Sequence, residues 1–163
     1  MYITSVMSAA GTDNAPSQRY YLNTWIYIPL HLRVTLSLSH FIGLIHGDDF
    51  PPVYYFSIGG MNTMRNIVFP FVGLDYMEAN GTNIHAVGSG IQVEVFKNFF
   101  IAPRCNFARI KDSAADVIGG SINTVYGYGI TAGYLGFLGP LQFTVARGSN
   151  DKFYYYFNLG FVF

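Results

Sequence analysis

The chain has 163 residues, of which 51% are hydrophobic, 18% aromatic and only 11% charged, and its formal net charge at pH 7 is +0. Water-soluble domains carry roughly 25% charged residues, so this composition argues against a soluble surface. The balanced charge argues against nucleic acid as a partner. No apolar run reaches the ~18 residues that a membrane helix needs. Instead, an apolar, aromatic-rich chain with weak segment signals is typical of a transmembrane β-barrel.

Strand candidates follow one another along the chain, separated by clusters of turn residues. Before the middle of the chain, strands are predicted over residues 1–9, 19–28 and 32–43, with a polar loop at 11–18 and a short turn at 29–31. The alternation of apolar and polar residues is lost in a long segment, residues 44–82. After it, strands are predicted over residues 83–96, 99–110, 124–135, 141–148 and 153–163.

Apolar residues alternate with small or polar ones in these strands, so each strand has one apolar face. In residues 83–96, for example, one face carries Val87, Ile91, Val93 and Val95, and the other Ala86, Gly88, Gly90, Gln92 and Glu94. We therefore expect an all-β, antiparallel, up-and-down transmembrane barrel domain over residues 1–163, with about eight strands and hydrocarbon on its outer wall. A soluble sandwich, the alternative, would carry charged outer faces.

The connections alternate between long and short, as they do between the outer and periplasmic rims of such barrels. The interior of an eight-stranded barrel is just wide enough for side chains to fill it. Many of the inward-facing residues of these strands are glycine or alanine, and such small side chains would leave that interior poorly filled. We therefore expect residues 44–82 to fold into a wider lumen, of which this chain supplies half the wall. A complete eight-stranded barrel that acts as a binding or structural module is the alternative.

Two stretches, FSIGGMNTMRNIVFPFVGL at 56–74 and NIHAVGSGIQVEVFKNFFIAP at 83–103, resemble the carboxy-terminal barrel of the bacterial surface antigen superfamily. That superfamily includes outer-membrane assembly pores and two-partner secretion pores. Within it, the similarity is strongest to the barrel that follows the hydrolase domain of patatin-like phospholipases of Bacteroidetes type. The resemblance covers roughly residues 30–163 and implies the last eight strands of a sixteen-stranded barrel in the outer membrane of a Gram-negative bacterium.

The resemblance also implies a motif in the lumen loop, namely an aromatic-x-x-Gly-Gly approach and an arginine at the tip. The matching residues are Phe56, Gly59, Gly60 and Arg65. In the family the arginine usually meets an acidic side chain on the inner wall, for which the inward candidates here are Glu94 and Asn106. A solvated loop arginine remains the alternative for Arg65.

The last residues, YFNLGFVF at 156–163, resemble the aromatic-ended signal that the barrel assembly machinery reads. The residues of this signal are Tyr156, Gly160, Phe161 and Phe163. The implied partners are outer-membrane lipid, the assembly machinery, and a missing half-barrel that comes from the same chain upstream, a second chain or a second copy. The implied function is to anchor a fused or associated domain, with translocation of that domain as a further expectation.

An enzymatic role for the chain itself is not expected. The Gly-x-Ser-x-Gly elbow of a patatin hydrolase is missing from the sequence, so any hydrolase domain would lie outside this chain. Residues 1–25 also lack the basic head and apolar run of a secretory signal. The sequence suggests no cofactor and no metal site, since His46, Asp48 and Asp49 have no recognised ligand spacing.

Overall fold

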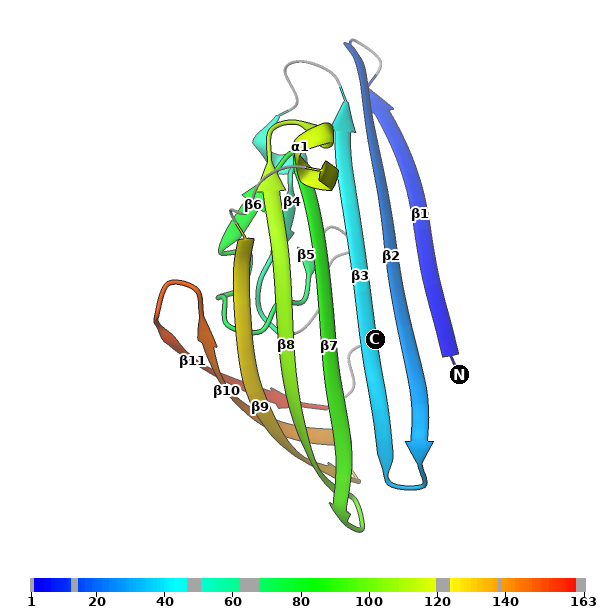
Figure 1. Cartoon of the computed structure of the whole chain (residues 1–163), viewed down its shortest axis with the longest axis vertical. Helices are drawn as coiled ribbons and strands as arrows, with labels where there is room; N and C mark the ends of the chain where they lie inside the picture. Colours follow the sequence, from blue (N-terminus) through cyan, green and yellow to red (C-terminus); the bar gives the residue numbers. More distant parts are fainter. Residues whose placement is uncertain are drawn as a thin grey trace.

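A large antiparallel sheet dominates the computed structural model, which describes residues 2–12, 15–46, 51–61, 68–119, 124–137 and 139–160. Its strands are β1 (Tyr2–Thr12), β2 (Ala15–His31), β3 (Val34–His46), β7 (Asn83–Phe96), β8 (Phe99–Lys111), β9 (Thr124–Gly136), β10 (Gly139–Gly148) and β11 (Phe153–Leu159). They lie in the order β1-β2-β3-β7-β8-β9-β10-β11, each antiparallel to the next (Figure 1). The predicted up-and-down arrangement of eight antiparallel strands is therefore confirmed.

Two predicted connections were placed wrongly. The polar loop predicted at residues 11–18 lies mostly within strands, because β1 runs to Thr12 and β2 begins at Ala15. The other is the turn between β2 and β3. The sequence placed a reversal at residues 29–31, but β2 continues through Pro29 to His31, and the chain turns at residues 32–33. The strand register shifts between Pro29 and His31. Proline has no N–H for a sheet hydrogen bond and is tolerated at such irregularities, so it does not mark the end of this strand.

The segment between β3 and β7 contains a second, smaller sheet. It begins with a 3-10 turn, η1 (Pro52–Tyr54), followed by β4 (Phe56–Ile58), β5 (Val68–Phe69) and β6 (Ala79–Gly81). β4 pairs in parallel with β5 and antiparallel with β6. In Figure 1 this small sheet lies behind the large one, on the side towards which β10 and β11 curve.

Among the described residues, α-helix occurs in one connection between strands. The loop between β8 and β9 contains α1 (Ala114–Gly119), a single short helix near one end of the sheet (Figure 1). No helix in the described part of the chain is both long and apolar enough to cross a membrane.

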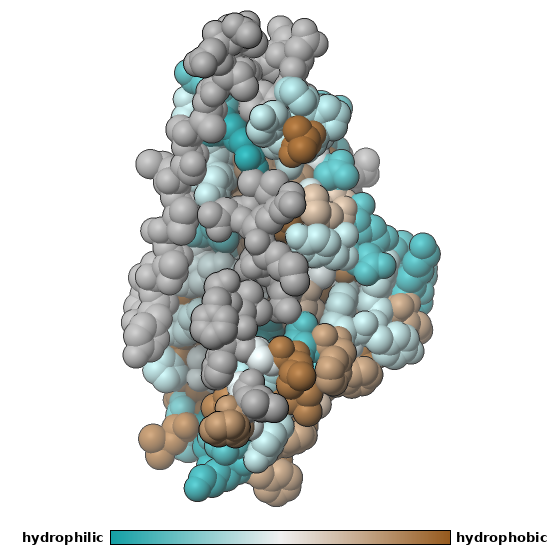
Figure 2. All heavy atoms as spheres, turned by 180° about the vertical axis from the view of Figure 1, so that it is seen from behind, coloured by the Kyte–Doolittle hydropathy of each residue, from teal (hydrophilic) through white to brown (hydrophobic). Residues whose placement is uncertain are grey.

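The two faces of the large sheet differ as the alternation predicts. In β11 the outward Phe153, Tyr155 and Phe157 are 61%, 68% and 67% exposed, whereas Tyr154 between them is 9% exposed. The same contrast recurs along β7, β8, β9 and β10, where the outward Val, Ile, Phe and Tyr side chains are exposed or half-buried. The turn at residues 149–152 beyond these strands is hydrophilic and projects from the edge of the molecule (Figure 2). Apolar side chains therefore cover the outward face of the sheet.

The buried core lies on the opposite face, between the large sheet and the small one. Phe41 from β3 lies with its ring centroid 5.6 Å from those of both Phe56 and Phe69, which come from β4 and β5. Trp25 of β2 adds a ring at 5.9 Å from Phe69. All three phenylalanines are completely buried, and each contributes about 1.5–3 kcal/mol to stability. The connection between β3 and β7 thus supplies one side of the hydrophobic core.

Candidate functional site

The candidate site is the inner face of the large sheet together with the segment that covers it. We call residues 56–61 and 68–81 of that segment the wall loop. Its small sheet places hydrophobic side chains against β2, β3 and β7, whereas residues 72–78 lie against β8 to β11. The chemistry of the site depends on how this loop is held.

Glycines on the inner wall allow the backbone of the wall loop to approach the sheet. A Cβ atom on Gly127 of β9 would lie 1.8 Å from the carbonyl oxygen of Val72, and one on Gly148 of β10 would lie 2.1 Å from that of Gly73. Gly73 itself has φ +88, and its Cβ would lie 2.6 Å from the carbonyl oxygen of Arg147. The inner wall is thinly lined at these positions because a second backbone lies directly on it.

Two wall side chains bind the loop backbone at the same place. The Oδ1 atom of Asn106, on β8, accepts a hydrogen bond of 3.1 Å from the backbone N–H of Val72. The hydroxyl of Tyr156, on β11, accepts one of 3.0 Å from the N–H of Gly73 and donates one of 2.8 Å to the carbonyl of Leu74. Three consecutive loop residues thus find their polar partners on the wall, as buried backbone groups require.

A carboxylate from the wall loop makes the third attachment. The hydroxyl of Tyr154 lies 3.0 and 2.9 Å from the two carboxylate oxygens of Glu78, and the side-chain amide of Asn150 donates to Oε1 at 3.2 Å. The Oε2 atom also accepts a hydrogen bond of 2.6 Å from the N–H of Asp75. Hydrogen bonds to an ionised carboxylate are roughly twice as strong as neutral ones. This contact therefore secures the loop at the β10–β11 hairpin.

The aromatic-Gly-Gly motif lies at the base of the wall loop. Phe56 is completely buried, and the side chain of Arg19, on β2, lies over its ring with Cζ 4.3 Å from the centroid. Gly59 and Gly60 have φ +135 and +73, and a Cβ on Gly59 would lie 1.9 Å from the carbonyl oxygen of Asp75. These glycines let the chain turn out of β4 where another backbone crosses it.

The remaining predicted site residues are spread over the sheet or fall outside its described part. Glu94 lies at the turn between β7 and β8, where Oε1 accepts a hydrogen bond of 3.0 Å from the N–H of Asn98. Its Cα pairs with Phe100, six residues or roughly 20 Å along β8 from Asn106, so the structure does not bring Glu94 and Asn106 together. Gly160 has φ +89 and donates to the carbonyl of Pro140 at 3.0 Å. Arg65, Phe161 and Phe163, like Asp48 and Asp49, lie outside the described residues.

Sequence reasoning missed several residues of this site. Glu78 carried no motif, and its partners Tyr154 and Asn150 lie 76 and 72 positions away along the chain. Arg19 had a local signal, because alternation in β2 places it on the same face as the buried Tyr21. The alternation could therefore have identified Arg19 as an inward arginine, but not its contact with the ring of Phe56.

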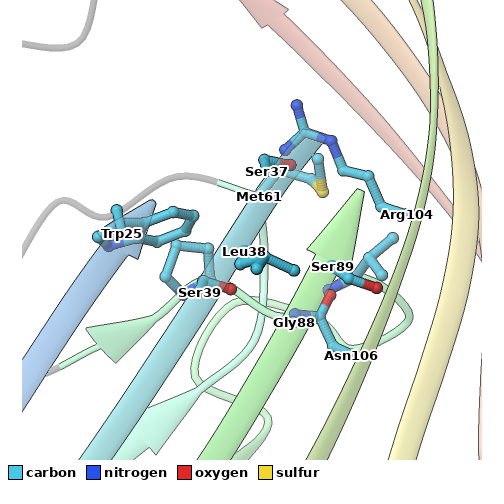
Figure 3. Close-up of a pocket in the computed structure, with 11 residues that line it drawn as sticks. Trp25, Ser37, Leu38, Ser39, Met61, Gly88, Ser89, Arg104 and Asn106 are labelled. Carbon is cyan, nitrogen blue, oxygen red and sulfur yellow. The ribbon is translucent and has the colours of Figure 1, made fainter. Parts of the chain in front are cut away.

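A small cavity remains between the wall loop and the sheet. Its volume is about 60 Å³. It is lined by Trp25, Ser37, Ser39, Met61, Gly88, Arg104 and Asn106, among others. In Figure 3 the Arg104 side chain extends from β8 across β7 towards Ser37 on β3. A volume of this size has room for a few water molecules. Within the residues that the structure describes, no three His, Cys, Asp or Glu side chains are placed to hold a metal ion.

The comparison with known proteins agrees with this architecture. No curated protein matches the sequence of the chain. The family model of the OMP85 superfamily matches residues 22–163, which is most of the chain and includes the whole of β3 and of β7 to β11. This superfamily consists of outer-membrane β-barrel proteins. The apolar outward face and the eight antiparallel strands of this chain agree with such a barrel. The chain belongs to the OMP85 superfamily.

Proposed function

We propose that the chain forms half of a sixteen-stranded outer-membrane barrel that anchors a fused or associated domain and takes part in its translocation. The barrel would form one domain over residues 1–163, with the connection at 44–82 folded into the lumen. Membership of the OMP85 superfamily gives the outer-membrane barrel itself. The patatin-like hydrolase is the domain that the sequence resemblance implies, and it would lie outside this chain. The chain would then act as a membrane anchor rather than as an enzyme.

The observation that carries the proposal is the way in which the wall loop is held. Asn106, Tyr154 and Tyr156 hold residues 72–78 of it through hydrogen bonds, and its small sheet is held by apolar packing against β2, β3 and β7. Each such bond contributes about 0.5–1.5 kcal/mol, or roughly 1.5–3 kcal/mol when one partner is charged. A loop attached in this manner blocks the inner side of the barrel at rest and can be displaced without breaking a covalent bond. Translocation through the same barrel needs both properties.

The edges of the large sheet support a barrel with additional strands. In the described residues, β1 pairs with β2 alone and β11 with β10 alone. Unpaired backbone groups in hydrocarbon cost several kcal/mol each, and membrane-spanning sheets therefore close on themselves. A missing half-barrel, from the same chain upstream, a second chain or a second copy, would pair with both edges. The barrel assembly machinery would insert the closed form, directed by the signal at Tyr156, Gly160, Phe161 and Phe163.

Cross-linking between the edge strands tests this arrangement. In a Cys105→Ser background, cysteine pairs are placed along β1 and β11 of the protein in native membranes, and disulfide formation is followed by electrophoresis. We expect no cross-link between the two strands of one chain and efficient cross-links from each of them to strands of the missing half. Efficient cross-linking of β1 to β11 within one chain would instead establish a complete eight-stranded barrel.

Substitution by arginine tests which face of the sheet meets lipid. Phe143→Arg on the outward face of β10 should destabilise the folded barrel by about 2–4 kcal/mol, the cost of a charge near the bilayer midplane. Gln142→Arg, one residue earlier on the inward face, should cost much less. The folded fraction of each variant is measured in lipid vesicles by heat-modifiable migration during a urea titration. Equal destabilisation by the two variants would contradict a lipid-facing outward wall.

A further inference from the structure

Two histidines and one arginine lie close together on the outward face of the sheet, on the side away from the wall loop. His40 of β3 and His85 of β7 lie with their Nε2 atoms 3.1 Å apart and their ring centroids 5.1 Å apart. Arg109 of β8 is the Cα partner of His85. A surface hollow is lined by His85 and Arg109 together with Val87, Phe107 and Ala108. We call His40, His85 and Arg109 the outer cluster.

The outer cluster lies at the level of the lipid headgroups if the outward wall faces lipid, as the proposed function requires. β8 begins at Phe99, next to the short turn that joins it to β7, and Arg109 lies ten residues, or ~34 Å, further along the strand. At a tilt of about 40° this is a height of ~26 Å, and the apolar band of outer-membrane barrels is ≈ 25 Å tall. The cluster therefore lies at the edge of the hydrocarbon that is remote from the short turns.

The hydrogen-bonding groups of the cluster favour an anion. When the two neutral imidazoles share one proton between their Nε2 atoms, the accepting ring carries its own proton on Nδ1 and presents it as a donor. Arg109 makes no ion pair with an acidic side chain among the described residues. A guanidinium at the edge of hydrocarbon extends towards polar partners at the headgroup level, and phosphate oxygens match its donors in two-pronged geometry.

We propose that the outer cluster binds the phosphate group of a membrane lipid. The exposed side chains of Val87 and Phe107 adjoin the cluster on the side of the hydrocarbon. An acyl chain below the headgroup would cover them, which a free phosphate ion cannot do. This apolar flank selects a lipid phosphate over inorganic phosphate, and the guanidinium selects a phosphate over an uncharged headgroup.

Native mass spectrometry of the detergent-purified barrel tests the proposal. Dimyristoyl phosphatidic acid, dimyristoylglycerol with the same acyl chains, and inorganic phosphate serve as probes. We expect the barrel to retain phosphatidic acid but neither of the others. Arg109→Gln should weaken retention about tenfold through the loss of a charge-assisted hydrogen bond, and Arg109→Lys should restore part of it.

Arg147→Gln is the matched control, because this outward arginine is already paired with Asp151 at 2.8 Å. It should leave retention unchanged. Equal retention by Arg109→Gln and the wild type, or binding of inorganic phosphate in place of the lipid, would overturn the proposal. Folding of each variant is verified by heat-modifiable migration. A protein that purifies without detergent would refute the proposed function, whereas a detergent-dependent barrel with unaltered lipid retention would refute only the outer cluster.

Discussion

Replacing Gly127 with alanine will detach residues 72–74 of the wall loop from the sheet. The new Cβ would lie 1.8 Å from the carbonyl oxygen of Val72, and the neighbour in its way is backbone, which cannot rotate aside. This part of the loop must leave the wall and give up the hydrogen bonds of Val72, Gly73 and Leu74. At ~1 kcal/mol for each of these bonds, the detached state gains roughly a hundredfold in population.

Ion conductance of the assembled barrel in planar bilayers measures this release. The Gly127→Ala barrel should show larger or more frequent openings than the wild type, and its wall loop should become sensitive to proteolysis. Gly136→Ala on the same strand is the control. Its Cβ would lie 3.3 Å from the ring of Tyr134, which can rotate, and at an ordinary contact distance of 3.8 Å from the carbonyl oxygen of Gly139. A Gly127→Ala barrel with the conductance of the control would show that the loop does not block the lumen.

Replacing Tyr156 with phenylalanine will loosen the loop without adding bulk. The hydroxyl satisfies both the N–H of Gly73 and the carbonyl of Leu74, and both of these residues are buried. A buried backbone group left without a partner costs about 1–3 kcal/mol, so the two together cost roughly 2–6 kcal/mol. We expect amide hydrogen exchange at Gly73 to accelerate by a factor of about thirty or more, because local opening of the loop becomes easier.

Tyr155→Phe is the matched control for this experiment. Tyr155 neighbours Tyr156 on the same strand but points outward and is 68% exposed. Its hydroxyl should be dispensable for protection of the Gly73 amide. Because Tyr156 also belongs to the resemblance-based assembly signal, the yield of folded barrel is scored separately from exchange within the folded barrel. A lower yield with unchanged exchange would show a role in assembly alone and would refute the role in loop attachment.

The structure shows a charged attachment of the loop in addition to the one that the sequence resemblance implies. The resemblance implies an arginine at the loop tip and an acidic partner on the wall, a prediction that concerns Arg65 and stays a prediction. In the described residues, the charged contact runs from Glu78 of the loop to Tyr154 and Asn150 of the β10–β11 hairpin. The acid on the wall, Glu94, instead caps the turn at Asn98. Loop attachment thus uses an acid for which the sequence had no motif.

Local pattern sufficed for the strands and their faces. Apolar residues at every second position fix which side of a strand is apolar without reference to any partner, so the alternation in residues 83–96 and 153–159 already gave the outward walls of β7 and β11. The turn at residues 29–31 was misplaced because a proline was taken as the end of a strand, and only the bulge in the pairing of β2 with β3 shows how it is accommodated.

The sequence by itself thus determined an antiparallel sheet with an apolar outer face, a thin inner face and a long interrupting segment, and the resemblance determined its superfamily. The tertiary structure alone decided which residues of the thin face hold the loop. Gly127 and Gly148 are small because the backbone at Val72 and Gly73 lies on them, and Tyr154 meets Glu78 across 76 positions of the chain. Such contacts depend on how the long segment folds back on the sheet. No periodicity encodes them, because periodicity records only the relation of a residue to its near neighbours.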